Sequence, residues 1–402
     1  MEVFVARQPI FDRQKEVYAY ELLFRSGFED YYDSLGAQKA SADLMAFVNF
    51  GELTDGKRGF AAFTRRLLLQ KFPSVLPADL LTVGVPVGIG IDDEVIAHCR
   101  RLKEAGYVLV MDDFALDHKD SPLVALADVI RLDFQSLSAE QRSRLGSGLL
   151  GKQVKLLGRN VETVDDFAAA NGAGFHFFQG GFLCRPACNG EADIPGNKLA
   201  YLRLLNEVNR SDLALDDLET IIKHDVTLTY RLLKFMNSAW FGIRYEVNSV
   251  RHALVLLGPK EIRKWASMLM LQNLSDDKPQ ELLLISLARA KAAEQIAPLV
   301  NLRKNVPELF LMGMFSVLDA LLDRPMPILL DELPVDQAVK AALLGVPGPF
   351  KNVYDLILSY EKGDWKEFSR AAAALNLDER AVPEVVQKSI KWANEAIGQL
   401  SG

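Results

Sequence analysis

The stretch that decides the fold is YVLVMDDF, residues 107–114, which is followed closely by VIRLDF, residues 129–134. Both are short, largely apolar runs, as is typical of strands buried on both faces of a sheet. Both carry acidic residues near their C-terminal ends. Residues 92–106 come before the first run, and there apolar residues recur at helical spacing until a glycine follows as a stop signal. This alternation predicts a parallel sheet covered by helices.

Similar apolar runs continue outward from these two strands. Roughly eight of them within the first 188 residues favour a closed β/α barrel over an open sheet. Besides 107–114 and 129–134, the expected strands are VFVAR (3–7), EVYAYELLF (16–24), GFAAF (59–63), LLTVGVPV (80–87), VKLLG (154–158) and FHFFQG (175–180).

The character of the chain changes after the last of these strands. Residues 188–198, CNGEADIPGNK, are rich in turn formers and lack any periodicity, which is typical of a linker. Beyond them the strand signals fade and helical periodicity takes over. We therefore expect an α/β plus all-α protein, with a TIM-like barrel over 1–188, a linker over 189–197 and a helical domain over 198–402.

The composition is that of a globular protein, because 402 residues with 49% hydrophobic and 25% charged side chains exclude a disordered or fibrous chain. The net charge of −7 does not favour binding to a nucleic-acid polymer. Cys99, Cys184 and Cys188 form no disulfide framework and predict free thiols in a reducing cytoplasm. We expect no signal peptide, because Arg7 and Asp12 stand where it needs an apolar run. We expect no membrane span, because no stretch approaches ~20 uninterrupted apolar residues.

Reactive side chains in a β/α barrel project from the C-terminal ends of its strands. Those ends carry Glu21, Asp112, Asp113, Arg131, Asp133, Glu162 and Gln179. Carboxylates that meet at one mouth suit hard cations such as Mg²⁺ or Mn²⁺, and two such ions can clamp a phosphodiester and activate water. The alternative is that these acids cap the helices that follow, or are solvated.

The segment RQPIFDRQKEVYAYELLFR, residues 7–25, resembles the opening of EAL domains, which are cyclic di-GMP phosphodiesterases. The Glu-x-Leu-x-Arg signature of that family is here Glu21, Leu23 and Arg25. Further matches follow in the same order and spacing up to residue 188, namely Asp112 and Asp113 in MDDF, Glu162 in NVET, and Gln179, Gly180 and Pro186 in FFQGGFLCRP. The resemblance implies a modified TIM-like barrel.

The resemblance also implies roles for individual positions. In active members the signature Glu, an Asn, a second Glu and the first Asp bind metal, and the second Asp serves the second metal. A Lys acts as base, and the Arg grips a substrate phosphate. Here Ala62 stands at the Asn position and Arg131 at the Lys position. Gly84 and Val87 stand where the family carries Glu-x-x-Glu.

These departures bear directly on the chemistry. Ala62 and Gly84 supply no side-chain oxygen, so a cation pair loses two ligands. Arg131 cannot serve as a general base, because its pKa exceeds ~12. We therefore expect a barrel without efficient phosphodiesterase activity and assign no catalytic residue. The remnant site comprises Glu21, Asp112, Asp113, Arg131 and Glu162, of which Glu21, Asp112 and Asp113 are vestigial metal ligands.

The side chains that survive leave two alternatives open. Arg25 and Arg131 are suited to pair with phosphate, and Gln179 to bond a base or ribose, so metal-free binding of cyclic di-GMP is one alternative. The other is a structural ion network between the leftover acids and Arg131, because acids without metal repel an anionic ligand.

Residues 215–242, LDDLETIIKHDVTLTYRLLKFMNSAWFG, resemble the start of HDOD domains, helical relatives of the HD metal phosphohydrolases. This resemblance covers about residues 197–400. His224 and Asp225 are adjacent, and adjacent helical side chains point about 100° apart, so this pair cannot converge on a metal without further ligands. We expect a structural role for His224 and His252.

A barrel followed by such a domain resembles the EAL–HDOD signalling proteins of bacteria, the YuxH-like group. The resemblance implies a cytoplasmic protein that acts as a cyclic di-GMP sensor or a scaffold, with a protein partner bound by the HDOD domain. No cofactor is expected. The alternative is a weakly active phosphodiesterase that uses Mg²⁺ or Mn²⁺. Relatives of the barrel often dimerise, so a homodimer is also among the expectations.

Overall fold

The structure is a computed structural model that describes residues 4–25, 51–69, 76–112, 114, 121–146, 154–187, 196–210, 214–224, 226–237 and 247–401. Its internal contacts divide the chain into two compact units. The barrel unit comprises residues 1–185 and 358–366, and the helical unit comprises residues 186–357 and 367–402. The predicted linker, 189–197, falls mostly outside the described residues and stays a prediction.

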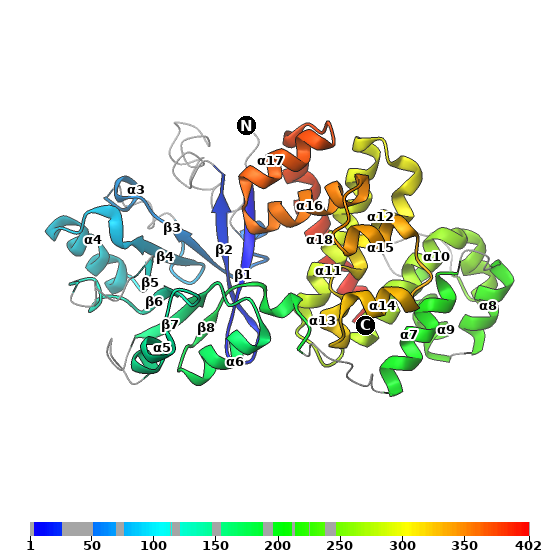
Figure 1. Cartoon of the computed structure of the whole chain (residues 1–402), viewed down its shortest axis with the longest axis horizontal. Coiled ribbons are helices and arrows are strands. Elements are labelled where there is room, and N and C mark those ends of the chain that lie inside the picture. The colour runs from blue at the N-terminus through cyan, green and yellow to red at the C-terminus, as the bar shows by residue number, and fades with distance from the viewer. Residues whose placement is uncertain are drawn as a thin grey trace. The chain divides into compact units, whose positions relative to one another are not determined.

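The barrel unit contains eight strands that close into a barrel in chain order (Figure 1). They are β1 (Val5–Phe11), β2 (Val17–Phe24), β3 (Arg58–Ala62), β4 (Leu81–Pro86), β5 (Val108–Asp112), β6 (Val129–Asp133), β7 (Lys155–Arg159) and β8 (Phe177–Phe178). Each of them lies in one of the eight predicted runs or overlaps it, so the predicted barrel is confirmed.

One strand departs from the predicted parallel sheet. Strand β1 runs antiparallel to both β2 and β8, whereas β2 to β8 are parallel to one another. The cause is the tight connection between β1 and β2, where the Asp12 carboxylate accepts hydrogen bonds from the backbone N–H groups of Gln14 and Glu16. So short a turn joins antiparallel neighbours only, because a parallel pair needs a crossover of a dozen or more residues.

Helices and short 3₁₀ turns connect the strands. They are α3 (Arg65–Leu69), η2 (Val87–Ile89), α4 (Asp93–Glu104), α5 (Ala139–Gly146), α6 (Val164–Gly172) and η4 (Gly181–Cys184). Helix α4 follows the predicted pattern, since Val95, Cys99 and Leu102 are its buried residues and the Asp92 side chain caps its first turn. Helix α6 begins with a capping box between Thr163 and Asp166.

The described part of the helical unit contains helices and 3₁₀ turns, as predicted. They are α7 (Gly196–Val208), α8 (Leu215–His224), α9 (Val226–Met236), α10 (Val250–Leu274), α11 (Gln280–Ile296), η5 (Ala297–Val300), η6 (Arg303–Asn305), α12 (Val306–Phe315), α13 (Leu318–Leu322), α14 (Met326–Glu332), α15 (Gln337–Leu343), α16 (Pro349–Lys362), α17 (Trp365–Ala374), η7 (Glu379–Ala381) and α18 (Val382–Ser401). Helix α11 packs against α12 and α18, and α10 packs against α7.

The barrel interior is built in layers. One side chain from each strand except β4 forms an apolar layer, which consists of Ile10, Ala19, Phe60, Val110, Val129, Leu157 and Phe177. Side chains two positions further along a strand point to the same face. The residues two positions beyond Ala19, Val110, Val129 and Phe177 are therefore directed to the inside of the barrel as well, at the C-terminal ends of their strands.

Gly180, which follows β8, lies closely against the backbone of Val161. Its φ is +150°, and a Cβ built on it would lie 2.2 Å from the backbone oxygen of Val161. We predict that Gly180→Ala lowers the free energy of unfolding by at least ~2 kcal/mol, since strained backbone alone costs about 1–3 kcal/mol. Urea denaturation measures this loss.

Gly172→Ala is the matched control, because a Cβ built on Gly172 meets nothing within 4 Å. We expect this variant to be neutral or slightly stabilised, since alanine is the better helix former. Equal unfolding midpoints for the two variants would contradict the prediction.

Candidate functional site

Four side chains meet above the apolar layer of the barrel. They are Glu21 on β2, Asp112 on β5, Arg131 on β6 and Gln179, which directly follows β8. All four are more than nine-tenths buried. The structure thus brings together four of the residues that the sequence singled out, at the strand ends where they were expected.

Arg131 lies at the centre of this group. Its Nε and one terminal nitrogen donate to the two oxygens of Asp112, at 2.5 and 2.7 Å. Its other terminal nitrogen donates to Glu21 Oε1 at 2.5 Å. The planar guanidinium therefore binds one carboxylate through two parallel bonds and a second carboxylate through a third bond.

The charges explain why these groups are stable in the interior. Burial by itself would lower the pKa of the Arg131 guanidinium, but the charges and hydrogen bonds of Glu21 and Asp112 outweigh that effect and raise its pKa. Arg131 therefore stays protonated at neutral pH. It acts here as the counter-ion of two buried carboxylates and cannot accept a proton.

Gln179 completes the environment of Glu21. Its Nε2 donates to Glu21 Oε2 at 2.5 Å and to Gln8 Oε1 at 3.2 Å. Both partners are acceptors, so the amide nitrogen must face them and Gln179 Oε1 must point away. That buried oxygen has no hydrogen-bond partner among the described residues.

Phe60 and Gly84 shape the floor of the site. The Arg131 guanidinium carbon lies 4.8 Å from the centre of the Phe60 ring, a cation–π contact. A Cβ built on Gly84 would lie 2.7 Å from Phe60 Cε2. The aromatic ring thus fills the space that a side chain at position 84 would need, and it supports Arg131 there.

The remaining predicted residues lie elsewhere or outside the description. Arg25 is exposed after the end of β2, with its guanidinium carbon 5.0 Å from the Phe4 ring centre. Glu162 is exposed after β7, and one of its carboxylate oxygens lies over Gly181. Ala62 is exposed at the end of β3, and Asp113 lies outside the described residues.

Sequence reasoning missed Gln8 and Phe60. Both could have been found from the alternation of their strands. Gln8 is two positions from Ile10, which belongs to the apolar layer, and it pairs with Glu21 across β1 and β2. Phe60 pairs with Glu21 across β2 and β3.

The residues at this mouth do not fit a metal pair. Both carboxylates are bound to Arg131, and positions 62 and 84 carry no side-chain oxygen. Within the described part of the chain, no three His, Cys, Asp or Glu side chains gather closely enough to hold a metal ion. A divalent ion beside Arg131 would add like charge to a site whose acids are already neutralised in part.

Several polar residues of the helical unit, including the His224, Asp225 and His252 named above, have structural partners or lie outside the description. Asn237 bonds to Leu233 and Val247 of the backbone, and it closes the connection between α9 and α10. Ser316 accepts a hydrogen bond from buried Arg289. The N–H of His252 donates to the capping Ser249. Asp225 and the side chain of His224 lie outside the described residues.

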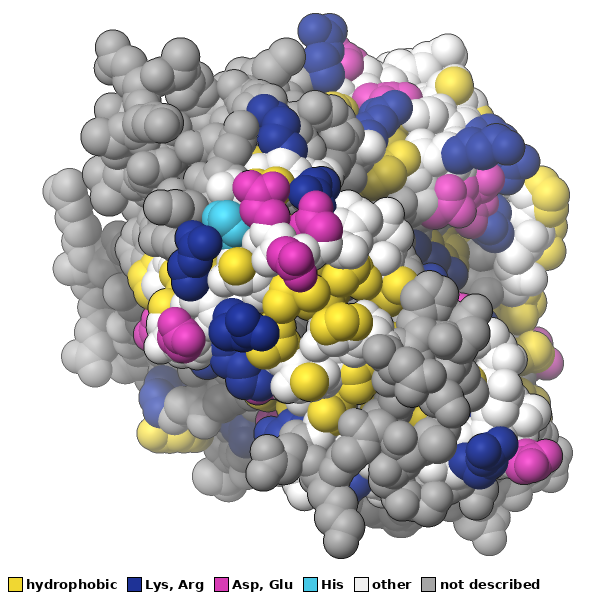
Figure 2. All heavy atoms as spheres, turned by 90° about the vertical axis from the view of Figure 1, so that its left-hand side faces the viewer, with side chains coloured by type: hydrophobic (Ala, Val, Ile, Leu, Met, Phe, Trp, Pro, Cys, Tyr) yellow, Lys and Arg dark blue, Asp and Glu magenta, His cyan; other side chains and the backbone are white. Residues whose placement is uncertain are grey.

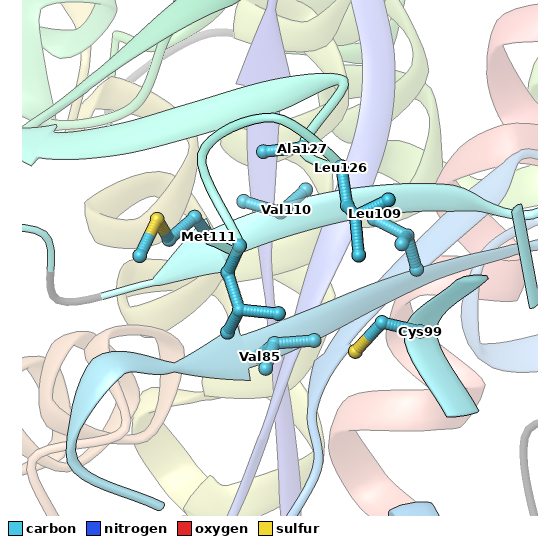
Figure 3. A pocket seen from close by; sticks show the side chains of 8 residues that line it. Val85, Cys99, Leu109, Val110, Met111, Leu126 and Ala127 are labelled. Atoms are coloured by element: carbon cyan, nitrogen blue, oxygen red, sulfur yellow. The ribbon is translucent and has the colours of Figure 1, made fainter. Parts of the chain in front are cut away.

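The barrel unit also has an apolar pocket beside α4 (Figure 3). Val85, Cys99, Leu109, Val110, Met111, Leu123, Leu126 and Ala127 line it. The thiol of Cys99 is the polar group in this lining, and burial raises its pKa to about 11. The pocket therefore presents an inert thiol rather than a nucleophile.

Charge is mixed on the surface that Figure 2 shows. Acidic and basic side chains of the described residues lie interspersed around a group of hydrophobic side chains. No described helix combines the length and apolar character that crossing a bilayer requires.

The HDOD domain family matches residues 194–322 of this chain. Two relatives are similar over nearly its whole length. YuxH of Bacillus subtilis is 32% identical over 98% of this chain and 98% of its own. The cyclic di-GMP phosphodiesterase CdgJ of Vibrio cholerae is 30% identical over 98% of this chain and 92% of its own.

Solved structures of EAL proteins resemble part of the chain. BlrP1 of Klebsiella pneumoniae, in its calcium and cyclic di-GMP complex, is 19% identical and covers 45% of this chain and 54% of its own, with a TM-score of 0.35. An EAL domain protein of Listeria monocytogenes is 15% identical and covers 44% of this chain and 86% of its own, with a TM-score of 0.35.

The central ion network generates a stability prediction. Arg131→Met leaves Glu21 and Asp112 buried without their counter-ion, and we expect a loss of about 3–5 kcal/mol in the free energy of unfolding. Urea denaturation measures it. Arg65→Met is the control, because Arg65 pairs with Asp92 and Glu94 at the surface. A midpoint for Arg131→Met that matches this control would count against a stabilising network.

The pocket generates a reactivity prediction. In a variant carrying Cys184→Ser and Cys188→Ser, we expect a thiol reagent at pH 8 to label Cys99 only after unfolding. The thiolate forms in the folded protein only as the pH approaches about 11, and the side chain is 0% exposed. Rapid labelling of the folded variant at pH 8 would show that the thiol is accessible.

Proposed function

We propose a function for this chain from one premise: it belongs to the EAL–HDOD family of bacterial signalling proteins. We infer that it is a non-catalytic member, whose barrel does not turn over cyclic di-GMP efficiently. One observation carries this inference. The two carboxylates best placed to receive a cation, Glu21 and Asp112, are both bound to the Arg131 guanidinium.

The charge at the mouth supports this proposal. Two carboxylates and one permanent cation give the described cluster a net charge of about −1. A divalent ion is therefore attracted only weakly. Binding such an ion would require Arg131 to leave two partners at once. Arg131 cannot act as a general base, since it holds its proton, and the carboxylates of Glu21 and Asp112 already accept hydrogen bonds from it.

The same geometry bears on ligand binding. Three of the five N–H groups of the Arg131 guanidinium, one on each nitrogen, already donate to carboxylates, so a phosphate would compete with Glu21 and Asp112 for a cation whose charge they already neutralise. We therefore place a scaffold role ahead of a cyclic di-GMP sensor. The oxygen Oε1 of Gln179 remains available as an acceptor for a ligand.

The HDOD domain is the part that we propose to bind a protein partner. Several large hydrophobic side chains within the matched range are exposed, namely Tyr230 at 62%, Val255 at 65%, Leu256 at 41% and Leu299 at 47%. Apolar side chains of this size at a surface are a common feature of protein interfaces.

The alternative is a weakly active phosphodiesterase. The similarity to CdgJ favours it, because CdgJ is described as a cyclic di-GMP phosphodiesterase and is 30% identical to this chain over 98% of its length. On this reading Arg131 moves aside when Mg²⁺ or Mn²⁺ arrives, and Glu21 becomes a metal ligand.

A turnover assay separates the two functions. Purified full-length chain is incubated with cyclic di-GMP and Mg²⁺ or Mn²⁺, beside a Glu21→Gln variant and CdgJ as a positive control. We expect no linear dinucleotide from the wild type above the amount from Glu21→Gln. Mn²⁺-dependent product that disappears in Glu21→Gln would overturn the proposal in favour of the enzyme.

Calorimetry then separates the scaffold from the sensor. We expect no heat of binding when cyclic di-GMP is added to the wild type in the presence of EDTA. Saturable binding under these conditions that weakens at least tenfold in Gln179→Leu would establish the sensor instead.

A further inference from the structure

A short segment near the C-terminus belongs to the barrel unit although the chain on both sides of it belongs to the helical unit. This segment, residues 358–366, comprises the end of α16, the turn at Gly363 and the start of α17. We call it the corner segment. The sequence gives no sign of its position, since the helices on both sides of the turn have the pattern of ordinary amphipathic helices.

Three contacts seat the corner segment on strands β1 and β2. Tyr360, which is 2% exposed, donates its hydroxyl hydrogen to the backbone oxygen of Val5 at 2.9 Å. Trp365 packs edge-on against Phe4, with ring centres 6.5 Å apart. A Cβ built on Gly363 would lie 2.8 Å from Leu23 Cδ1, so the turn lies directly on β2.

Gln8 joins this seat to the mouth of the barrel. Its Nε2 donates to the backbone oxygen of Glu361 at 3.4 Å, and its Oε1 accepts from Gln179 Nε2 at 3.2 Å. Gln179 in turn donates to Glu21, which accepts from Arg131. A continuous path of hydrogen bonds therefore runs from the corner segment to the ion network.

The two ends of the Gln8 amide are not interchangeable. Its nitrogen must face a carbonyl oxygen and its oxygen must face an N–H donor. Flipping the amide would break both bonds and oppose like groups at each end. The orientation of Gln8 therefore depends on Gln179 at one end and on the corner segment at the other.

We propose that Gln8 is a positioning residue that couples the arrangement of the barrel mouth to the seating of the corner segment. A rearrangement that withdraws the Gln179 amide loosens the corner segment, and unseating the corner segment disturbs the ion network at Arg131. Such coupling acts equally in both directions. It goes beyond the proposed function, because it requires neither turnover nor cyclic di-GMP.

A double-mutant cycle on the full chain tests the path from mouth to corner. Hydrogen exchange is measured at the amides of Gly363 and Asp364, which bond to Tyr360 and Ser359 within the segment. We expect Gln179→Leu to speed this exchange at least fivefold in the wild type and to add nothing further in Gln8→Leu, since coupling free energies are commonly of that size or larger. The exposed Gln14→Leu is the control and should change nothing.

Either of two results would overturn the proposal. One is that Gln179→Leu leaves exchange at the corner segment unchanged. The other is an equal acceleration by Gln179→Leu in the wild type and in Gln8→Leu, which indicates general loosening of the barrel rather than passage through Gln8.

The reverse direction is tested by a variant that does not touch the mouth. Gly363→Val should unseat the corner segment and shift the ¹⁵N side-chain resonance of the Arg131 Nε–H group. Gly345→Val is the matched control. Gly345 has a positive φ, of +82°, as Gly363 does, but the nearest atom would lie 4.0 Å from the added Cβ, so the variant introduces similar backbone strain without a close contact. A resonance at the wild-type position in Gly363→Val would contradict the coupling, as would the same shift in Gly345→Val.

Discussion

The rest of the barrel mouth depends on one interaction, in which the Arg131 guanidinium is shared between the carboxylates of Glu21 and Asp112. Buried acids are costly unless a charge and hydrogen bonds compensate them, and here one residue supplies both. A divalent cation would provide the same compensation at such a mouth. The guanidinium supplies this compensation here, but unlike a divalent cation it offers no activated water, and it has no group that can take up a proton.

The residues around the ion network support its arrangement. The Phe60 ring lies against Arg131 and fills the space over Gly84. The absence of a side chain at position 84 thus lets Phe60 pack against Arg131. Gln179 holds the oxygen of Glu21 that Arg131 leaves free, and Gln8 holds Gln179. The mouth is thus a closed polar layer above an apolar one, with Gln179 Oε1 as its unsatisfied buried acceptor among the described residues.

The barrel could be predicted because each strand is a local run of apolar residues. The length and the spacing of such a run can be read from a few consecutive residues. The antiparallel direction of β1 was missed, although the short turn at Asp12 contains the information. Whether Arg131 grips phosphate or the leftover acids could not be decided, since Glu21 is 110 positions away and their meeting depends on barrel register. The corner segment could not be predicted either, because Tyr360 and Trp365 look like the core residues of any amphipathic helix.

Anomalous diffraction from crystals of the full chain soaked in Mn²⁺ tests most directly whether Arg131 keeps metal from the mouth. We expect no anomalous peak beside Asp112, with the Arg131 guanidinium still lying between Asp112 and Glu21. Two well-occupied Mn²⁺ ions at that place, with Arg131 displaced from both carboxylates, would contradict this expectation.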